Sequence, residues 1–361
     1  MRAVVMDAPG RPTSVEELEV DDPQSGELLV RLTASGVCHS DLHVRDGDWL
    51  RPTPIVMGHE GAGIVEAVGP GVERSLVGRR VALSWYAPCL RCRDCQAGRQ
   101  WLCSGSASIR HRAADGTTRL RRPGGEEVLS YLGIGTLAER TVVPAEAAIA
   151  LPDEVAPEVA ALIGCCVTTG VGAVLKTADV PAGASVAVFG LGGVGLSVVM
   201  GAVVAGASTI VGVDRVAAKL DRALDLGATH GVLAGDDPGE TVRAVRGASG
   251  GAGPDFAFEA AGLATTIGQA IEVLPPGGTA VLVGLTRFGE RASFEVFPVV
   301  DGSRRIVGSN YGYAVAAVDF PRYAELHLAG RLPVESLIDE RIELDGVEAA
   351  FDRLRRGEGL R

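Results

Sequence analysis

Four cysteines lie close together in one short segment of this chain, at Cys89, Cys92, Cys95 and Cys103. A C-x₂-C-x₂-C-x₇-C run places four soft thiolates on one loop, enough to complete the tetrahedral coordination of a Zn²⁺ ion. Such a shell has no open position, so it predicts a structural zinc, with the chemistry of the protein located elsewhere. Three further cysteines are too distant in sequence to join that loop locally: Cys38, Cys165 and Cys166.

Composition argues against a nucleic-acid or membrane partner. The 361 residues carry a net charge of −11, whereas a nucleic-acid site needs a clustered basic surface. We interpret the most basic segment as a solvated surface loop; it contains Arg110, His111, Arg112, Arg119, Arg121 and Arg122. The sequence begins MRAVVMDAPG, without the apolar core of a signal peptide. With metal-type cysteine spacing in addition, a reducing, cytoplasmic location is expected.

Residues 180–213 contain no charged side chain and are long enough, by length alone, to cross a membrane. Glycines interrupt the stretch repeatedly, and it divides into a strand, a turn, a helix and a second strand. We therefore expect no membrane span.

Two patterns alternate along the chain and predict an α/β protein with two domains. In residues 1–150, frequent Gly and Pro separate short apolar runs, a pattern that predicts short strands and few helices. The strands are expected at 2–6, 27–34, 61–68, 80–83 and 138–143, with one helix at 38–45. From about Val155, apolar strands alternate with Ala-rich helices, which is typical of a doubly wound parallel sheet. Its strands are expected at 185–189, 209–213, 256–259 and 279–284, and its helices from Val194 and at 217–226 and 265–274.

After about Arg305 the mixed pattern returns, with helices expected near 320–329 and 347–355. The sequence therefore predicts a β-rich domain of residues 1–166 and 310–361, interrupted by a nucleotide-binding domain of residues 167–309.

A glycine-rich turn follows the predicted strand that ends at Phe189: Gly190, Gly192, Gly193 and Gly195 form a G-x-G-x-x-G run. Between a strand and a helix, these glycines allow a tight turn and let backbone N–H groups approach a pyrophosphate. The next strand ends at Asp214, whose carboxylate would bind an adenosine ribose and repel the 2′-phosphate of NADP. NAD is therefore favoured, although Arg215 could serve a phosphate. A glycine turn that only packs a strand on a helix is the alternative.

A second metal site is predicted from three separate segments. Cys38 follows a strand, His59 precedes one, and Cys165 opens the segment that leads into the nucleotide-binding domain. A Cys₂His set provides three protein ligands and leaves a fourth position for water or substrate, as in catalytic zinc sites. Taken singly, each residue could instead be an ordinary buried Cys or a core His.

Together these motifs make the chain resemble the zinc-dependent medium-chain alcohol dehydrogenase family. GVCHSDLH, GHEGAGIVEAVG, the four-cysteine loop, LIGC, GLGGVG, and Asp214 with Lys219 occur in family order. The resemblance implies a GroES-like β-rich catalytic domain interrupted by a doubly wound Rossmann domain. It also implies NAD, two Zn²⁺ per chain and a small-molecule alcohol or aldehyde substrate. Within the family, the chain is most similar to bacterial aryl or aliphatic alcohol dehydrogenases and to mycothiol-dependent formaldehyde dehydrogenases.

The resemblance assigns roles to individual residues. Cys38, His59 and Cys165 would bind the catalytic zinc, with Glu60 as a nearby carboxylate. Ser40 would bind the substrate oxygen, and His43 would end a proton relay that passes through the cofactor ribose. Cofactor contacts would come from the glycine turn and from His39, Thr169, Val194, Asp214, Lys219, Val283, Gly284 and Arg361. Cys166 is interpreted as a packing residue.

Substrate and assembly are also implied by family position. The pocket would be walled by Trp49, Trp85, Ile109 and Tyr311, which suits an aromatic or medium-chain primary alcohol; either tryptophan could instead be core. The long segment 104–135 is typical of family dimers, so a homodimer paired through a strand near 304–308 is expected.

Two other functions remain open from the sequence. A mycothiol-dependent formaldehyde dehydrogenase or nitrosothiol reductase would need cationic groups at the pocket mouth, which the arginines at 110, 112, 121 and 122 could provide. A non-catalytic zinc- and NAD-binding protein would be expected to lack Cys38, His59 or Ser40, yet all three are present.

Overall fold

The computed structural model describes the backbone of residues 1–361 and all side chains except those of residues 107 and 108. The chain divides into two compact units, and the second is inserted in the first. The first unit comprises Met1–Cys165, Val315–Ala329 and Val334–Arg361; the second comprises Cys166–Ala314 and Gly330–Pro333.

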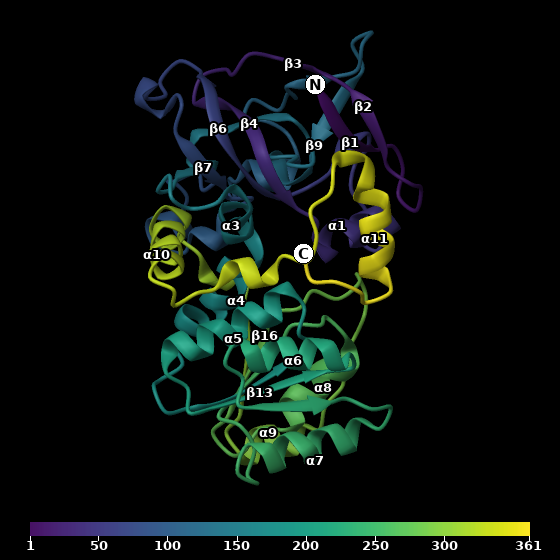
Figure 1. Cartoon of the computed structure of the whole chain (residues 1–361), viewed down its shortest axis with the longest axis vertical. Coiled ribbons are helices and arrows are strands. Elements are labelled where there is room, and N and C mark those ends of the chain that lie inside the picture. Colours follow the sequence, from purple (N-terminus) through teal and green to yellow (C-terminus); the bar gives the residue numbers. More distant parts are fainter. The chain divides into compact units, whose positions relative to one another are not determined.

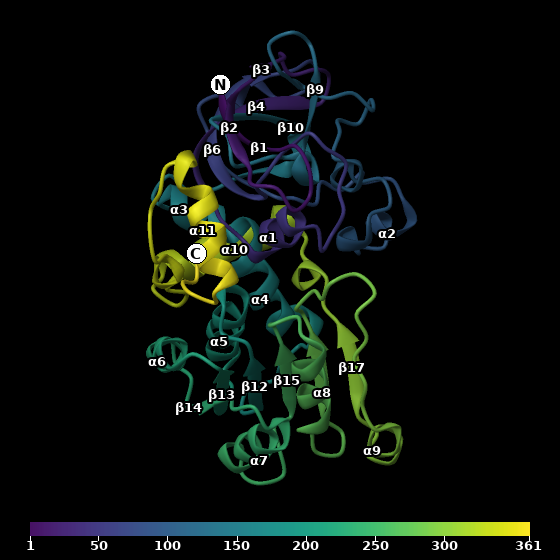
Figure 2. The same ribbon diagram turned by 90° about the vertical axis from the view of Figure 1, so that its right-hand side faces the viewer.

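Two β-sheets form the first unit, and most of their strands are labelled in Figures 1 and 2. One sheet has the order β2-β1-β5-β9-β8-β3, with bounds Ser14–Glu17, Arg2–Met6, Ile55–Val56, Glu127–Ser130, Leu120–Arg121 and Glu19–Val20. The other has the order β10-β4-β6-β7-β11, with bounds Arg140–Pro144, Glu27–Gly36, Glu60–Val68, Arg80–Leu83 and Ala148–Ala150. Buried Val, Leu, Ile and Met side chains of the sheets form three cores, together with side chains of neighbouring helices and loops.

Helices complete the first unit: α1 (His39–Asp46), α2 (Arg93–Gln96), α3 (Pro157–Leu162), α10 (Ala316–Leu328) and α11 (Val347–Arg355). Helix α1 begins directly after β4, and a reciprocal capping box between Cys38 and Asp41 fixes its first turn. It ends at Gly47, which adopts the left-handed conformation at φ 86°. The predicted helix 38–45 is therefore present.

The second unit is a six-stranded parallel sheet with helices on both faces. Its order is β14-β13-β12-β15-β16-β17, with bounds His230–Leu233, Thr209–Asp214, Ser185–Phe189, Phe256–Glu259, Thr279–Leu282 and Arg305–Gly308. The helices are α4 (Thr168–Gly172), α5 (Gly193–Ala205), α6 (Ala217–Asp225), α7 (Pro238–Ala248), α8 (Ala264–Glu272) and α9 (Val296–Asp301). Figure 2 shows the strands side by side, with β17 at one edge.

Alternating residues of each strand serve opposite faces of this sheet. Ala187 and Phe189 of β12 share a core with buried side chains of α7 and α8. Gly212 of β13 lies under Leu191 and Ala223, on the side covered by α6. This confirms the predicted doubly wound sheet and explains why its inner strands, β12, β13, β15 and β16, are mostly apolar.

The uncharged stretch 180–213 forms β12, α5 and β13, as predicted. A different segment, Pro157–Thr177, is a helix long and apolar enough to cross a membrane. However, 83% of its most apolar window is buried inside the molecule, as in the core helix of a globular protein. Strand β14 was not predicted, because only Val232 of its four residues is buried and no apolar pattern results.

Candidate metal and cofactor sites

The four cysteines of the loop converge on one point. Each pair of sulfur atoms among Cys89, Cys92, Cys95 and Cys103 lies within 4.8 Å. Cys92 caps the N-terminus of α2, where its sulfur accepts a hydrogen bond from the Cys95 amide at 3.5 Å. Gly105 has no side chain, which lets the chain pass close to Cys89. The loop is therefore folded as a four-thiol cage.

The thiols of this cage differ in acidity. Hydrogen bonds from backbone amides lower the pKa of Cys89 and lower the pKa of Cys92 to about 6. Burial raises the pKa of Cys103 and raises the pKa of Cys95 to about 12. Four crowded thiolates repel one another unless a cation balances their charge, so the donor set fits a zinc ion.

The second cluster joins three distant segments of the first unit. Ligand atoms of Cys38, His59, Glu60 and Cys165 all lie within 4.8 Å of one another, and all four residues are buried. Two thiols, one imidazole and one carboxylate form a donor set suited to zinc. The structure thus brings together the three residues that the sequence proposes as catalytic ligands, with Glu60 beside them.

A glycine precedes each part of this cluster and makes the approach possible. A side chain on Gly36 would collide with the Glu60 carboxylate. Gly58 has φ 93° and packs tightly against the Leu137 backbone, and Gly164 leaves room for the Leu83 carbonyl. These glycines allow the ends of β4, β6 and β7 and the segment after α3 to approach closely enough for Cys38, His59 and Cys165 to meet.

Asp41 holds the imidazole of His59 and was missed by the sequence analysis. Its Oδ1 lies 3.0 Å from His59 Nδ1 and accepts the Gly58 amide at 3.2 Å, while its Oδ2 accepts the Cys38 amide at 3.2 Å. With Nδ1 engaged, Nε2 is the ring nitrogen available to a metal. The signal was present in the sequence: an acidic residue three positions after the helix cap is a capping-box pattern.

The charges of this cluster favour a bound cation. Although burial lowers it, the Asp41 carboxylate and the Cys38 thiolate raise the pKa of His59 well above its usual range. A hydrogen bond from Cys165, with the nearby Arg361 and His59 charges, lowers the pKa of Cys38. Burial raises the pKa of Glu60 to about 7. A thiolate and an imidazole that both favour charge are suited to coordinate zinc in place of a proton.

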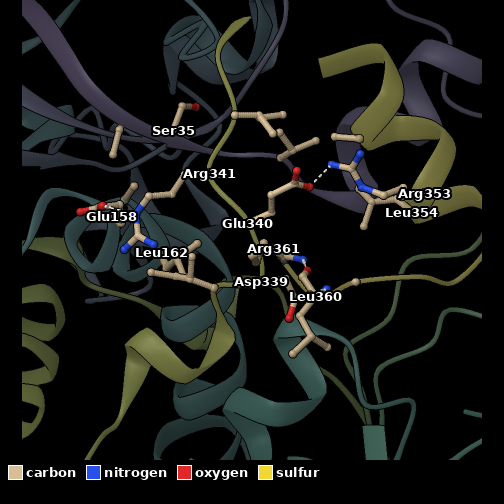
Figure 3. Close-up of a pocket in the computed structure, with 18 of the residues that line it drawn as sticks. Ser35, Glu158, Leu162, Asp339, Glu340, Arg341, Arg353, Leu354, Leu360 and Arg361 are labelled. Carbon is tan, nitrogen blue, oxygen red and sulfur yellow. Dashed lines mark hydrogen bonds and ion pairs between the residues drawn. The ribbon is translucent and has the colours of Figure 1, made fainter. Parts of the chain in front are cut away.

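Arg361 lies at this cluster. Its Nε is 3.1 Å from Glu60 Oε2, and its Nη2 is 3.4 Å from Cys38 Sγ. It also lines a cavity of about 250 Å³ in the first unit, between β4, α3 and the C-terminal segment. Figure 3 shows the ion pairs that line this cavity, Glu158 with Arg341 and Glu340 with Arg353. Family position predicts a cofactor contact for Arg361; in the structure its guanidinium pairs with Glu60.

Helix α1 carries the residues proposed for proton transfer. Ser40 and His43 are three positions apart and share one face of the helix. His43 Nδ1 lies 2.8 Å from Asp48 Oδ2, and its ring stacks on Trp49 at 4.6 Å. The His39 ring meets the His43 ring in an edge-to-face arrangement. Asp48 therefore orients His43. This role of Asp48 was not predicted from the sequence.

The glycine turn of the second unit has the form expected of a dinucleotide site. Gly190 follows β12 with φ 90°, and a side chain on Gly195 would collide with the Gly190 carbonyl. At Gly192, the cap of α5, a side chain would point into open space. Asp214 accepts the amides of Leu191 at 2.8 Å and Val216 at 3.0 Å. The turn and its acidic residue thus form one rigid unit.

Other proposed cofactor contacts lie in the same unit. Gly170 lets α4, which carries Thr169, pack closely against the Val194 carbonyl of α5. Lys219 lies in the first turn of α6. The amides of Val283 and Gly284, just after β16, donate to the Glu259 carbonyl at 2.8 and 2.9 Å.

Glu259 itself escaped the sequence analysis. It is fully buried, and its Oε1 accepts the amides of Ala261 and Gly262 and the hydroxyl of Thr266. It therefore fixes the loop that follows β15. A single acidic residue at the end of the apolar strand FAFE was the only signal.

The four residues proposed for the substrate pocket lie in different surroundings within their own units. Trp49 is 5% exposed in a core with Val4, Met6 and other apolar side chains, whereas Trp85 packs against a different core. Ile109 is 56% exposed. Tyr311 is buried in the second unit. For Trp49, the structure favours the core interpretation, because this residue belongs to one buried cluster with side chains of β1, β5 and α11.

Four arginines of the basic segment form ion pairs with carboxylates: Arg112, Arg119, Arg121 and Arg122. Ion pairs join Arg112 to Glu127, Arg121 to Asp21, and Arg122 to Glu16. Two members are not on the surface: Arg119 is buried with Glu27, and His111 is 5% exposed. The surface-loop interpretation is therefore wrong for these two residues, because their partners come from distant parts of the chain.

Comparison with known proteins gives a consistent result. Residues 24–153 match the family described as alcohol dehydrogenase GroES-like domain, and residues 193–328 match the family described as zinc-binding dehydrogenase. An NDMA-dependent alcohol dehydrogenase of Amycolatopsis methanolica is 36% identical, covering 100% of this chain and 97% of that protein. An S-(hydroxymethyl)glutathione dehydrogenase of a Synechocystis species is 35% identical over 100% of this chain and 98% of that protein. The structure of benzyl alcohol dehydrogenase from Acinetobacter calcoaceticus has a TM-score of 0.92 and 30% identity, covering 99% and 97% of the two chains.

Proposed function

The chain belongs to the zinc-dependent alcohol dehydrogenase family, and we propose that it transfers a hydride between a primary aromatic or medium-chain alcohol, or its aldehyde, and NAD. The observation that carries this proposal is the convergence of Cys38, His59 and Cys165. Three protein ligands leave one coordination position for the substrate oxygen, whereas the four-cysteine cage leaves none.

The chain's own residues would divide the work as follows. When bound, zinc would supply Lewis acidity at Cys38, His59 and Cys165, and NAD would supply the hydride acceptor. Asp41 keeps His59 in the tautomer that presents Nε2. Ser40 would take the proton from the substrate hydroxyl, and His43, oriented by Asp48, would pass a proton to solvent.

NAD rather than NADP is supported by the second unit. Asp214 presents a carboxylate beside the glycine turn, where a 2′-phosphate would be repelled. Arg215, which could serve such a phosphate, is paired with Asp236 at 2.9 Å. Binding of NADH and NADPH, followed by nicotinamide fluorescence, tests this directly; tighter binding of NADPH would contradict it.

The substrate class is supported by the relative named as a benzyl alcohol dehydrogenase. The test is a panel of benzyl, cinnamyl, geranyl and short aliphatic alcohols, followed through NADH absorbance. Reduction of NAD with the aromatic and longer alcohols is expected. Failure of every alcohol on a protein that holds two zinc ions would contradict the proposal.

A thiol-adduct substrate is the second candidate, favoured by the relative named as an S-(hydroxymethyl)glutathione dehydrogenase. Against it, Arg112, Arg121 and Arg122 are engaged with carboxylates rather than available to an anionic thiol. Formaldehyde oxidation with and without mycothiol or glutathione separates the two candidates. A strict requirement for the thiol would favour this one.

We also propose a homodimer that works in the cytoplasm. Strand β17 is an exposed sheet edge, and α9 beside it exposes Phe297 (77%) and Val300 (73%). An apolar edge of this kind is normally covered by pairing with another chain. All seven cysteines are free thiols, which suits a reducing compartment. Sedimentation should show a dimer that Phe297→Asp converts to monomer; a wild-type monomer would contradict the assembly.

A further inference from the structure

The cluster of Cys38, His59 and Cys165 is called the assembled metal site from here on. Three aromatic rings lie in series and end at this site: His111, Tyr131 and His59, which we name the three-ring stack. The His111 ring stacks on Tyr131, with centroids 5.8 Å apart and planes at 22°. Tyr131 in turn meets His59 edge-to-face, with centroids 5.7 Å apart and planes at 86°. Both geometries are favourable for aromatic pairs. His59 is thus held by the Asp41 carboxylate at Nδ1 and by the edge-to-face contact with the Tyr131 ring.

His111 has an unusual conformation for a residue with a side chain. It is 5% exposed and has φ 58°, in the left-handed region. Its Nδ1 accepts the amide of Leu132 at 3.0 Å, and Leu132 is itself left-handed at φ 49°. Its carbonyl accepts the Ser130 amide at 3.2 Å. Strained backbone persists only where the surroundings fix it, and here it is fixed on both sides of Tyr131.

We propose that His111 is a positioning residue for the assembled metal site. Its ring holds Tyr131 against His59, so that His59 keeps the orientation in which Nε2 meets Cys38 and Cys165. The inference rests on the proposed function, because the orientation of His59 matters only if His59 binds a metal. No motif in the sequence indicates this role, since His111 lies among surface arginines.

Two properties explain why histidine suits the position. The buried amide of Leu132 needs an acceptor, which a phenylalanine could not provide. Burial, with Arg51 nearby, lowers the pKa of His111 to about 4, so the ring stays neutral near pH 7. A neutral His111 ring can stack on Tyr131 without placing a positive charge close to the residues that would bind zinc.

The test separates stacking from hydrogen bonding by replacing His111 in two ways. His111→Phe keeps an aromatic ring and loses the acceptor; His111→Ala loses both. Phe320→Ala, at a buried position in α10 outside the three-ring stack, is the control for general destabilisation. The readouts are the release of zinc to a chromogenic chelator and the visible d–d band of the Co²⁺-substituted protein. Zinc in the four-cysteine cage is the internal reference.

His111→Ala should release one of the two zinc ions about tenfold faster than wild type, at the low end of the effect of removing a partner of a metal ligand. It should also shift the Co²⁺ band. His111→Phe should stay within about twofold of wild type, and Phe320→Ala should lower the melting temperature without changing release. If His111→Ala does not fold, His111→Asn, which keeps an acceptor and lacks the ring, should behave as His111→Ala.

Unchanged release and an unchanged band in folded His111→Ala or His111→Asn would overturn the inference, as would equal acceleration in His111→Phe and His111→Ala. A wild-type protein that holds only one metal ion, in the four-cysteine cage, would overturn the proposed function and this inference with it. The two failures are therefore distinguishable.

Discussion

The two candidate metal clusters of the first unit differ in how the chain builds them. The four-cysteine cage comes from one loop, and its thiols are held by local backbone amides. The second cluster joins Cys38, His59 and Cys165 from three segments. It depends on close glycine contacts and on Asp41, which links the Cys38 and His59 segments. The cage therefore needs only its own loop, whereas the second cluster needs the folded unit.

The difference matches the two uses of zinc. A closed thiolate cage stabilises a loop with few buried apolar residues. An assembled site with an open position can bind a substrate, because its ligands come from rigid elements that leave one side clear. The comparison predicts that substitutions in the two clusters have separable consequences, one on activity and the other on stability.

Loss of a ligand from the assembled site should have the largest effect on activity. Cys38→Ser should reduce turnover at least about a thousandfold, because Lewis-acid assistance contributes several kcal/mol to the transition state. The zinc content should fall by one ion per chain, while the melting temperature changes little. Cys166→Ser, next to Cys165 but outside the cluster, is the control and should keep both zinc and activity. Full activity in Cys38→Ser would contradict the assignment.

Loss of a ligand from the cage should act on stability instead. Cys95→Ser should lower the free energy of unfolding by roughly 3 kcal/mol or more, since the loop loses its metal cross-link. Below the new melting temperature, the rate per folded molecule should stay near that of wild type. Thermal unfolding and turnover measured on the same sample provide the check. Inactivation without destabilisation would reverse the roles of the two clusters.

Asp41→Asn tests how far the assembled site depends on support beyond its ligands. An amide can bond His59 but carries no charge, so zinc affinity should fall by about 10- to 100-fold. The ligands themselves are untouched, and the four-cysteine cage should retain its ion. Zinc affinity is measured by competition with a chelator. Equal loss from both clusters would indicate general unfolding rather than loss of support.

His43→Gln should have a smaller effect on turnover, roughly tenfold. A group that accepts the substrate proton directly raises the rate about a hundredfold or more. His43 acts one step later, so its loss should lower turnover by less. Imidazole-type buffers should restore part of the rate. Kinetics indistinguishable from wild type would remove His43 from proton transfer.

The smallest effect is expected in the pH dependence of stability. The pKa of His111 is about 4 in the folded protein and about 6.5 when exposed, so the unfolded chain binds the proton first as the pH falls. Stability should therefore decrease between pH 6.5 and 5.5, by about 1 kcal/mol more in wild type than in His111→Phe. Denaturant unfolding at the two pH values measures this difference. Equal decreases in both proteins would show that His111 is protonated in the fold.

The sequence predicted those parts whose signals are local. The strands β12, β13, β15 and β16 were located within two residues, because parallel strands buried on both faces are continuous apolar runs. The four-cysteine loop and the glycine turn were also predicted, because each is a short motif within one segment of the sequence. For the assembled site, spacing alone was ambiguous, and only the order of several motifs made Cys38, His59 and Cys165 a set.

What the sequence did not show depends on tertiary packing. Trp49 was expected in a pocket wall or in the core, and its burial in one cluster with side chains of β1, β5 and α11 favours the core. Arg119 and His111 were expected at the surface, but Glu27 and Tyr131 bury them. Such partners are distant in sequence, so no local pattern could reveal them.

Anomalous diffraction at the zinc edge from crystals of the purified protein tests the central assignment most directly. Two peaks are predicted: one among the sulfurs of Cys89, Cys92, Cys95 and Cys103, and one within about 2.0–2.3 Å of the Cys38 and Cys165 sulfurs and His59 Nε2. A fully active crystal form with a single peak, in the four-cysteine cage, would contradict the account.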